Sequence, residues 1–236
     1  NWLYGLSLKT RNASGWNGEA IASYYDVSNG VARLANAGGL GNGPGTVTFG
    51  DGTGWKTLDL KATWTPPSPL PGLANHALAF GYHYDDYFLD NETFNTSNWR
   101  DGSAQSFANS FKGRTQTQAV YAQDAWRFAP RWKFVYGLRY EDWQAYNGAQ
   151  ALAGTNVPYP GADQHRFSPK ASLSFDVTDE LTLRASIGRA YRFPTVSELF
   201  QGKINGSSIV NNNPNLQPED DLSKELAAEW AHWNGL

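Results

Sequence analysis

The sequence contains no cysteine and no methionine among its 236 residues. Without cysteine, the chain cannot form a disulfide-stapled scaffold, a thiolate zinc site or an iron–sulfur centre, and it cannot use a cysteine nucleophile. Position 1 is Asn rather than an initiator Met. We therefore expect the chain to be a processed or partial product of a longer protein.

Charged residues are also scarce, at 17% of the chain, with 19 basic and 22 acidic side chains and a net charge of −3. This balance provides no basic footprint for a phosphate backbone, so nucleic acid is not an expected partner. No apolar run reaches the roughly 18 residues of a transmembrane helix, which excludes a helical membrane protein. A β-barrel stays compatible with the low mean hydropathy of −0.54, because barrel strands alternate apolar and polar residues.

Alternation with a period of two is the dominant pattern. Within 132–140, Trp, Phe, Tyr, Leu and Tyr alternate with Lys, Val, Gly and Arg, which is typical of a strand with two different faces. Similar alternation, or enrichment in β-forming residues, predicts about nine strands. The other eight lie at 4–9, 19–27, 58–64, 78–84, 115–128, 170–177, 181–188 and 222–233.

The connections between these strands alternate in length. Short links are expected near 12–18, 65–75, 129–131 and 178–180, and long ones near 28–53, 89–113, 147–164 and 190–220. Short turns therefore gather at one end of the strands and long loops at the other. Outer-membrane barrels have this arrangement, with short periplasmic turns and long extracellular loops. The predicted fold is an all-β, antiparallel transmembrane β-barrel.

The two faces of the strands support this fold. We expect two girdles of aromatic residues, one near the short turns and one toward the long loops; their members are Trp64, Trp126, Phe128 and Trp132, and then Tyr84, Tyr140 and Trp143. The opposite face carries Lys61, Lys133, Arg139, Lys170 and Arg184. Unpaired charges of this kind would cost several kcal/mol each in a dry core, so this face is expected to line a wet lumen.

Two motifs in the last third of the chain carry a family resemblance. The stretch 181–200 ends in Arg-Phe-Pro-Thr-Val-Ser-Glu-Leu-Phe, and Asn-Pro-Asn-Leu-Gln-Pro-Glu follows at 213–219. Together with 121–124 and 136–140, they resemble the barrel of TonB-dependent outer-membrane receptors. The motif residues are Arg192, Phe193, Pro194, Glu198, Leu199, Asn213, Pro214, Leu216, Pro218 and Glu219.

The resemblance implies energised uptake of a scarce nutrient across the bacterial outer membrane. The nutrient is most often a ferric siderophore, and in other members a different metal chelate, haem, cobalamin or a glycan. Expected partners are outer-membrane lipid, the substrate, and the TonB complex through parts of the receptor that are not in this chain. Residues 1–236 are expected to be about nine strands of a probable 22-strand barrel, without the plug domain.

The first motif also has a physical interpretation. Pro194 interrupts the strand, and the spacing from Thr195 to Glu198 is that of a capping box. A single helical turn over 196–200 is therefore expected, stopped by Gly202. The motif either anchors the loop or contacts the ligand, and the second role would require Arg192 or Tyr191 to face the lumen.

Candidate ligand contacts are aromatic and arginine residues of the long loops, since binding residues concentrate on loops held by a rigid scaffold. Aromatic rings could stack on a catecholate or sugar, and arginine could pair with an anionic chelate. The candidates are Trp99, Arg100, Tyr146, Tyr159, Tyr191 and Arg192.

Acidic residues near 83–92 raise the question of a metal site. Carboxylates of Asp85, Asp86 and Asp90 could hold a cation, but the spacing matches no calcium loop. A solvated acidic loop is the alternative, and no resident metal or cofactor is expected. No arrangement of serine, histidine and carboxylate matches a catalytic motif, so the chain is not expected to be an enzyme.

Two other kinds of protein share parts of this pattern. A small complete outer-membrane barrel, such as a porin or an adhesin, requires an even strand count and pairing between its first and last strands. A soluble all-β carbohydrate-binding domain requires a dry inner face.

Overall fold

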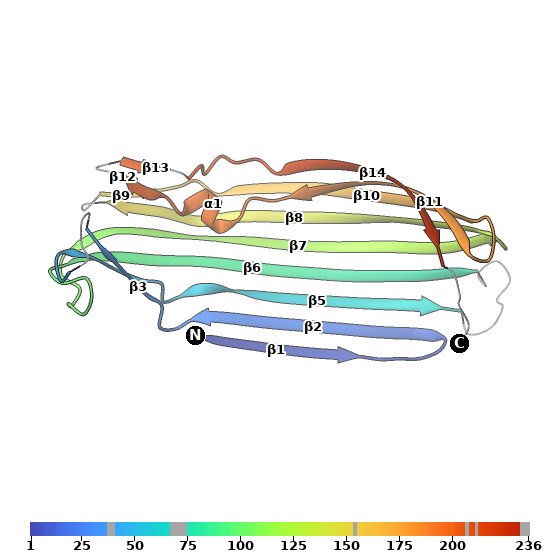
Figure 1. Cartoon of the computed structure of the whole chain (residues 1–236), viewed down its shortest axis with the longest axis horizontal. Helices are drawn as coiled ribbons and strands as arrows, with labels where there is room; N and C mark the ends of the chain where they lie inside the picture. The colour runs from blue at the N-terminus through green and yellow to red at the C-terminus, as the bar shows by residue number, and fades with distance from the viewer. Residues whose placement is uncertain (37–40, 67–74, 153–154, 206–207, 211, 232–236) are drawn as a thin grey trace.

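A computed structural model describes residues 1–36, 41–66, 75–152, 155–205, 208–210 and 212–231. Nine long strands follow one another as neighbours in a single antiparallel sheet (Figure 1). They are β1 (Trp2–Lys9), β2 (Gly15–Val27), β5 (Thr53–Thr65), β6 (His76–Thr96), β7 (Phe107–Ala129), β8 (Trp132–Leu152), β10 (Ala162–Asp176), β11 (Leu181–Arg192) and β14 (Glu219–Trp230). The predicted all-β fold and its nine strands are confirmed.

The shorter elements gather at one end of the sheet (Figure 1). These are β3 (Val31–Ala35), β4 (Gly45–Phe49), β9 (Thr155–Pro158), α1 (Val196–Phe200), β12 (Lys203–Asn205) and β13 (Ser208–Val210). Tight turns lie at the opposite end, at Pro130–Arg131 between β7 and β8 and at 177–180 between β10 and β11. The link expected at 65–75 falls mostly on 67–74, which lie outside the described residues, as do 232 and 233 of the last predicted strand.

At the long-loop end, several segments expected to be loops form strands instead. Residues 89–113 were expected to form a loop, but β6 continues to Thr96 and β7 begins at Phe107. The end of β6 pairs with β4 from Glu92↔Phe49 to Thr96↔Gly45, and with β7 on its other side. Backbone bonds to two neighbours hold this segment in the sheet, although its residues do not alternate in polarity. β8 likewise continues to Leu152.

Strand register sorts the side chains into an apolar face and a polar face. One row across the apolar face joins Leu60, Tyr82, Val120, Tyr140 and Phe167. The adjacent row, on the polar face, joins Glu19, Lys61, Gly81, Tyr121, Arg139 and Ser168. Because alternate residues of a strand point to opposite faces, these two rows confirm the separation predicted from the sequence.

A bulge in β8 changes the alternation near the long-loop end. Asn147 has a φ of 55°, and the β7–β8 register shifts between Lys112 and Arg114. One extra residue in β8 moves the residues beyond it to the other face. Gly148 and Gln150 therefore join Trp143 and Ala145 on the polar face.

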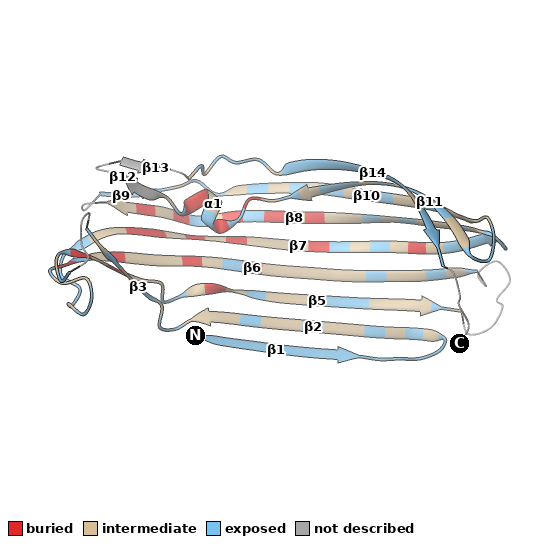
Figure 2. Cartoon of the chain, viewed as in Figure 1, coloured by how far each residue is buried: buried red, intermediate tan, exposed pale blue. Residues whose placement is uncertain are grey.

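Buried side chains concentrate where α1 lies over β6, β7 and β8 (Figure 2). This cluster contains Leu89, Phe111, Trp143, Ala145, Val196, Leu199 and Phe200. No helix in the described part of the chain is long and apolar enough to cross a membrane.

A charge placed on each face tests the assignment of the faces. Leu60 is 41% exposed on the apolar face, whereas Thr63 of the same strand lies on the polar face opposite Asn17 and Ala79. In the complete protein, Leu60→Arg is expected to lower the free energy of unfolding by about 2–4 kcal/mol, since the apolar face contacts hydrocarbon. Thr63→Arg is expected to have little effect. Denaturant titration in lipid vesicles measures both, and equal losses would contradict the assignment.

Candidate functional site

The helix α1 is held by the capping box that the sequence predicts. The Glu198 backbone N–H donates to Thr195 Oγ1 at 3.3 Å, and the Thr195 backbone N–H donates to Glu198 Oε2 at 2.9 Å. Each residue satisfies a backbone donor of the helix start that has no partner within the helix. The single turn at 196–200 is therefore confirmed, and buried Pro194 precedes it.

Two glycines in the strands beneath let α1 pack closely. A β-carbon added at Gly113 or Gly148 would lie 2.2 Å from the Phe200 ring. The ring thus lies directly on the backbone of β7 and β8, with Tyr159 stacked at a centroid distance of 6.0 Å. The neighbouring Leu199 is 1% exposed. A short helix that makes few contacts of its own is in this way held by a buried aromatic ring.

Trp143 departs from its expected place in an aromatic girdle. It is 2% exposed on the polar face and stacks on Phe193, with ring centroids 5.7 Å apart. The prediction was wrong because the alternation in β8 places Trp143 on the same face as Arg139 and Glu141, where α1 covers it.

Arg192 connects the two sequence motifs. Its guanidinium donates to Glu219 Oε1 at 2.5 Å and to Glu198 Oε2 at 3.1 Å. The Arg192 charge and the hydrogen bonds from Thr195 lower the pKa of Glu198 from 4.5 to about 2. Arg192 lies on the polar face, so one condition for a ligand contact is met, but both of its partners are carboxylates of this chain.

Asn212 and Asn213 bring the second motif back to α1. The Asn212 side-chain amide donates to the Leu199 carbonyl at 3.1 Å and to Tyr159 Oη at 3.5 Å. The Asn213 backbone N–H donates to the Glu198 carbonyl at 3.2 Å, and a turn closes from Leu216 N–H to the Asn213 carbonyl. These contacts show that both motifs anchor the loop. Asn212 was missed because its partners are set by the tertiary fold.

The other ligand candidates lie in different surroundings. Trp99 donates its indole N–H to the Gly41 carbonyl at 2.9 Å, and Arg100 lies over the Trp99 ring. Tyr146 has Arg114 over its ring at 5.8 Å, and Tyr191 contacts the guanidinium groups of Arg166 and Arg189. The structure therefore does not bring the six candidates together into one site.

The carboxylates considered for a metal also diverge. Asp85 points to the polar face and accepts from His83 Nε2 at 3.0 Å. Asp86 pairs with Arg114 at 2.6 Å, and Asp90 pairs with Lys112 at 3.1 Å, both on the opposite face. Within the described ranges, no group of three His, Asp or Glu residues is placed to hold a metal ion.

Charged groups on the polar face pair both within and across strands. Arg139 Nε donates to Glu141 Oε1 at 2.8 Å, and Ser168 Oγ donates to Glu141 Oε2 at 3.0 Å. His83 Nδ1 lies 2.7 Å from Asp59 Oδ1. This face therefore carries the charged side chains that the sequence places on it, and some of them are paired with a neighbour.

A further aromatic row on the polar face was missed. Tyr25, Trp55 and Tyr87 lie directly opposite one another on β2, β5 and β6. The Tyr25 and Trp55 rings stack at 4.2 Å, and the Trp55 and Tyr87 rings lie 6.5 Å apart. We call these three residues the aromatic shelf. Trp55 and Tyr87 lie outside the segments in which alternation predicts strands, and Tyr25 lies in a segment where the alternation is irregular. Only the strand register shows that the three side chains meet.

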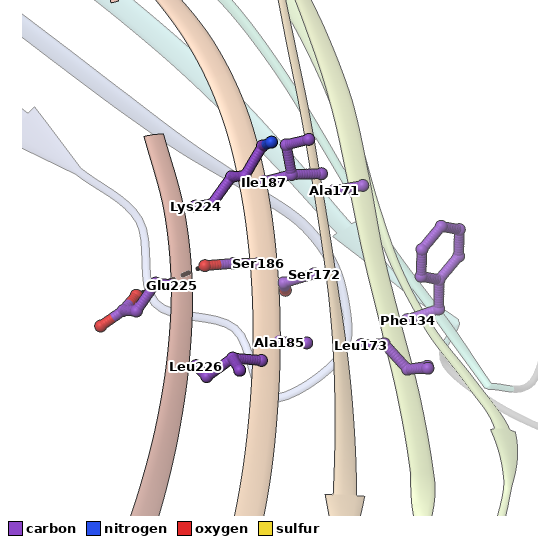
Figure 3. A pocket seen from close by; sticks show the side chains of 10 residues that line it. All are labelled: Phe134, Ala171, Ser172, Leu173, Ala185, Ser186, Ile187, Lys224, Glu225 and Leu226. Carbon is purple, nitrogen blue, oxygen red and sulfur yellow. Dashed lines mark hydrogen bonds between the residues drawn. The ribbon is translucent and has the colours of Figure 1, made fainter. Parts of the chain in front are cut away.

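A shallow groove is also present on β8, β10, β11 and β14 (Figure 3). Small side chains at Ala171 and Ala185 leave it between larger apolar ones, among them Phe134, Leu173, Ile187 and Leu226. It lies on the apolar face and has the character of a surface for lipid chains.

A family model described as "TonB dependent receptor-like, beta-barrel" matches residues 1–236. The chain is 24% identical over 250 residues to a ferric enterobactin receptor of Pseudomonas aeruginosa, covering 98% of the chain and 31% of that protein. It is 30% identical over 98 residues to a hemin receptor of Yersinia enterocolitica, covering 38% of the chain and 13% of that protein.

Solved structures agree on the fold. The unliganded ferric citrate transporter FecA superposes with a TM-score of 0.67 at 15% identity, covering 97% of the chain and 32% of that structure. The copper transporter OprC superposes with a TM-score of 0.66 at 15% identity, covering 98% of the chain and 36% of that structure. The chain thus spans about a third of the length of the proteins it matches over nearly all of its residues.

The glycine contacts of Phe200 generate one prediction. Gly148→Ala places a methyl group against the ring, so we expect α1 to detach and the amides of 196–200 to exchange faster with solvent. Phe200→Ala should also release α1, and it should lower the stability of the packed helix by about 3–5 kcal/mol, as for a large-to-small substitution in a protein core. Gly18→Ala, with no atom within 4 Å of the added carbon, is the control. Hydrogen-exchange mass spectrometry of the complete protein measures all three, and unchanged exchange in Gly148→Ala would contradict the packing.

Acid should release the same helix. A carboxyl whose pKa is depressed in the folded state stabilises the fold above its ordinary pKa and loses this effect as pH falls through the depressed value. For Glu198 the window runs from 4.5 down to about 2. Glu198→Gln keeps the capping geometry but removes the ion pair, so its α1 amides should exchange faster than wild type at pH 6. The difference should shrink toward pH 2, and a constant difference would exclude the ion pair as its cause.

Proposed function

Because the chain belongs to the TonB-dependent receptor family, and is matched over residues 1–236 by the model of that family's β-barrel, we propose that the complete protein imports a scarce nutrient across the bacterial outer membrane. The apolar face contacts outer-membrane lipid and the polar face lines the lumen. Residues 1–236 form part of the barrel wall. TonB supplies the energy through other parts of the complete receptor.

The observation that carries this proposal is the lumen side of the wall. Long loops at one end turn inward through α1, which is anchored on Trp143, Gly148 and Arg192. A rigid wall that holds loop segments over its lumen suits capture of a small molecule from outside. Transport rather than catalysis is the role these features support.

We further propose that the nutrient is a ferric siderophore or a similar iron chelate. This rests on a relative that is similar over nearly the whole chain, a ferric enterobactin receptor, and on an iron-regulated outer membrane virulence protein of Vibrio cholerae, 22% identical over 75% of the chain. Haem, another metal chelate or a glycan is the alternative.

A small complete barrel receives less support. In the described part of the chain, β1 pairs with β2 and β14 pairs with β11, and β1 and β14 do not pair with each other. A closed barrel of these strands would require that last pairing. A soluble carbohydrate-binding domain is likewise disfavoured. It would require a dry inner face, whereas one face of this sheet is apolar and outward-exposed and the other carries charged side chains.

Deletion of the gene for the complete receptor tests the proposal. We expect the deletion strain to lose uptake of radioactive iron from at least one class of ferric chelate. The complete gene should restore uptake in a strain with TonB but not in one without it. Unchanged uptake of every ferric chelate and of haem would contradict iron transport.

A further inference from the structure

The aromatic shelf lies beside α1 on the polar face of the sheet. The cross-strand row of Tyr25, Trp55 and Tyr87 continues through Thr115 and Ala145. The last two are buried beneath the α1 region, at 3% exposure each, whereas Tyr87 is 39% exposed. The helix thus covers one half of the row and leaves the aromatic half facing the lumen.

The groups next to the shelf are hydroxyls and carboxylates. One row away on the same face lie Ser23, Thr57 and Asp85, with Ser23 Oγ and Thr57 Oγ1 2.6 Å apart. One row further, His83 bridges Asp85 and Asp59, and the Asp59 side chain is 53% exposed. Near the shelf, the lumen face is therefore acidic and rich in hydrogen-bond acceptors.

On the polar face of β2, β5 and β6, cationic side chains lie far from the shelf. From the Tyr25–Trp55 pair, the rows run through Ser23–Thr57 and Ile21–Asp59 before Glu19–Lys61 brings the first lysine of β2, β5 and β6 on this face. Lys61 itself lies opposite Glu19. On the polar face, the described parts of β2, β5 and β6 thus offer no free positive charge beside the aromatic shelf.

Three arginines on the polar face of other strands are already paired with carboxylates. Arg139 pairs with Glu141, Arg184 pairs with Glu229, and Arg192 is held by Glu198 and Glu219. Recruiting any of them for an anionic ligand would break an existing ion pair.

We propose that the aromatic shelf is a substrate contact that selects an uncharged or cationic ferric chelate, such as a trihydroxamate, over a polyanionic tricatecholate. This inference rests on the proposed function and adds the class of substrate. The ring faces attract apolar and cationic surfaces through dispersion and cation–π contact. The carboxylates of Asp59 and Asp85 accept hydrogen bonds from ligand donors and repel a trianion, which provides specificity through an unfavourable interaction with the wrong ligand.

Binding to the complete, purified receptor tests the inference. Two probes are used: a linear ferric trihydroxamate that carries a free ammonium group, and a ferric tricatecholate trianion. We expect the wild type to bind the trihydroxamate more tightly. Trp55→Ala and Tyr87→Ala should each weaken that binding by about tenfold or more, equivalent to the loss of one good contact. Tyr24→Ala is the matched control. Tyr24 is next to Tyr25 in the sequence, but its side chain lies on the apolar face, where it stacks on Tyr4.

A charge reversal makes the test sharper. Asp59→Lys should shift the preference of the receptor toward the tricatecholate, since it replaces an exposed negative charge on the lumen face by a positive one. The inference would be overturned if the wild type bound the tricatecholate more tightly and if Trp55→Ala bound the trihydroxamate no more weakly than Tyr24→Ala. That result would not contradict the proposed uptake of iron. Binding of neither chelate, with unchanged iron uptake in the deletion strain, would overturn the proposed function itself.

One other occupant of the shelf is distinguishable. If the shelf instead contacts another domain of the receptor inside the lumen, Trp55→Ala should increase protease cleavage of that domain or open the barrel to large antibiotics, with chelate affinity unchanged. That result would overturn the assignment of the shelf as a substrate contact.

Discussion

The structure depends on one constraint, that every backbone N–H and C=O group inside hydrocarbon needs a hydrogen-bond partner. A continuous antiparallel ladder meets this need, because each of the long strands between β1 and β14 is paired on both sides; these are β2, β5, β6, β7, β8, β10 and β11. Once the backbone is committed to such a sheet, alternate side chains must face different surroundings. Leu60 and Val120 therefore lie toward lipid, while Lys61 and Tyr121 lie toward the lumen.

The same constraint explains where the functional groups lie. The sheet extends past the girdle of aromatics because β4 and β7 supply backbone partners to the upper part of β6. Above that level α1 packs directly on the sheet, because Gly113 and Gly148 have no side chain and leave room for the Phe200 ring. The Arg192 ion pairs then fix the return of the loop. Positioning of loops over the lumen thus follows from close backbone packing and a small set of paired charges.

Much of this could be predicted from the sequence, because alternation and capping are local. The nine strands, the polar lumen face and the turn at 196–200 follow from residues near one another in the chain. The length of β6 beyond residue 88 could not be predicted, because β4 stabilises it from a distant segment. Alternation in β8 already separates Trp143 from the apolar face, but the contact of its ring with Phe193 depends on the tertiary fold. The aromatic shelf likewise depends on the register that places Tyr25, Trp55 and Tyr87 side by side.

The central claim is that this chain forms a barrel wall with lipid on one face and a lumen on the other. Because the 236 residues contain no cysteine, single cysteines placed at 132–140 of β8 can carry a spin label in the complete receptor in lipid vesicles. Collision with dissolved oxygen, which concentrates in hydrocarbon, then reports lipid exposure residue by residue. The account predicts high accessibility at Phe134, Tyr136 and Leu138 and low accessibility at Val135, Gly137 and Arg139. Accessibility that does not alternate would contradict it.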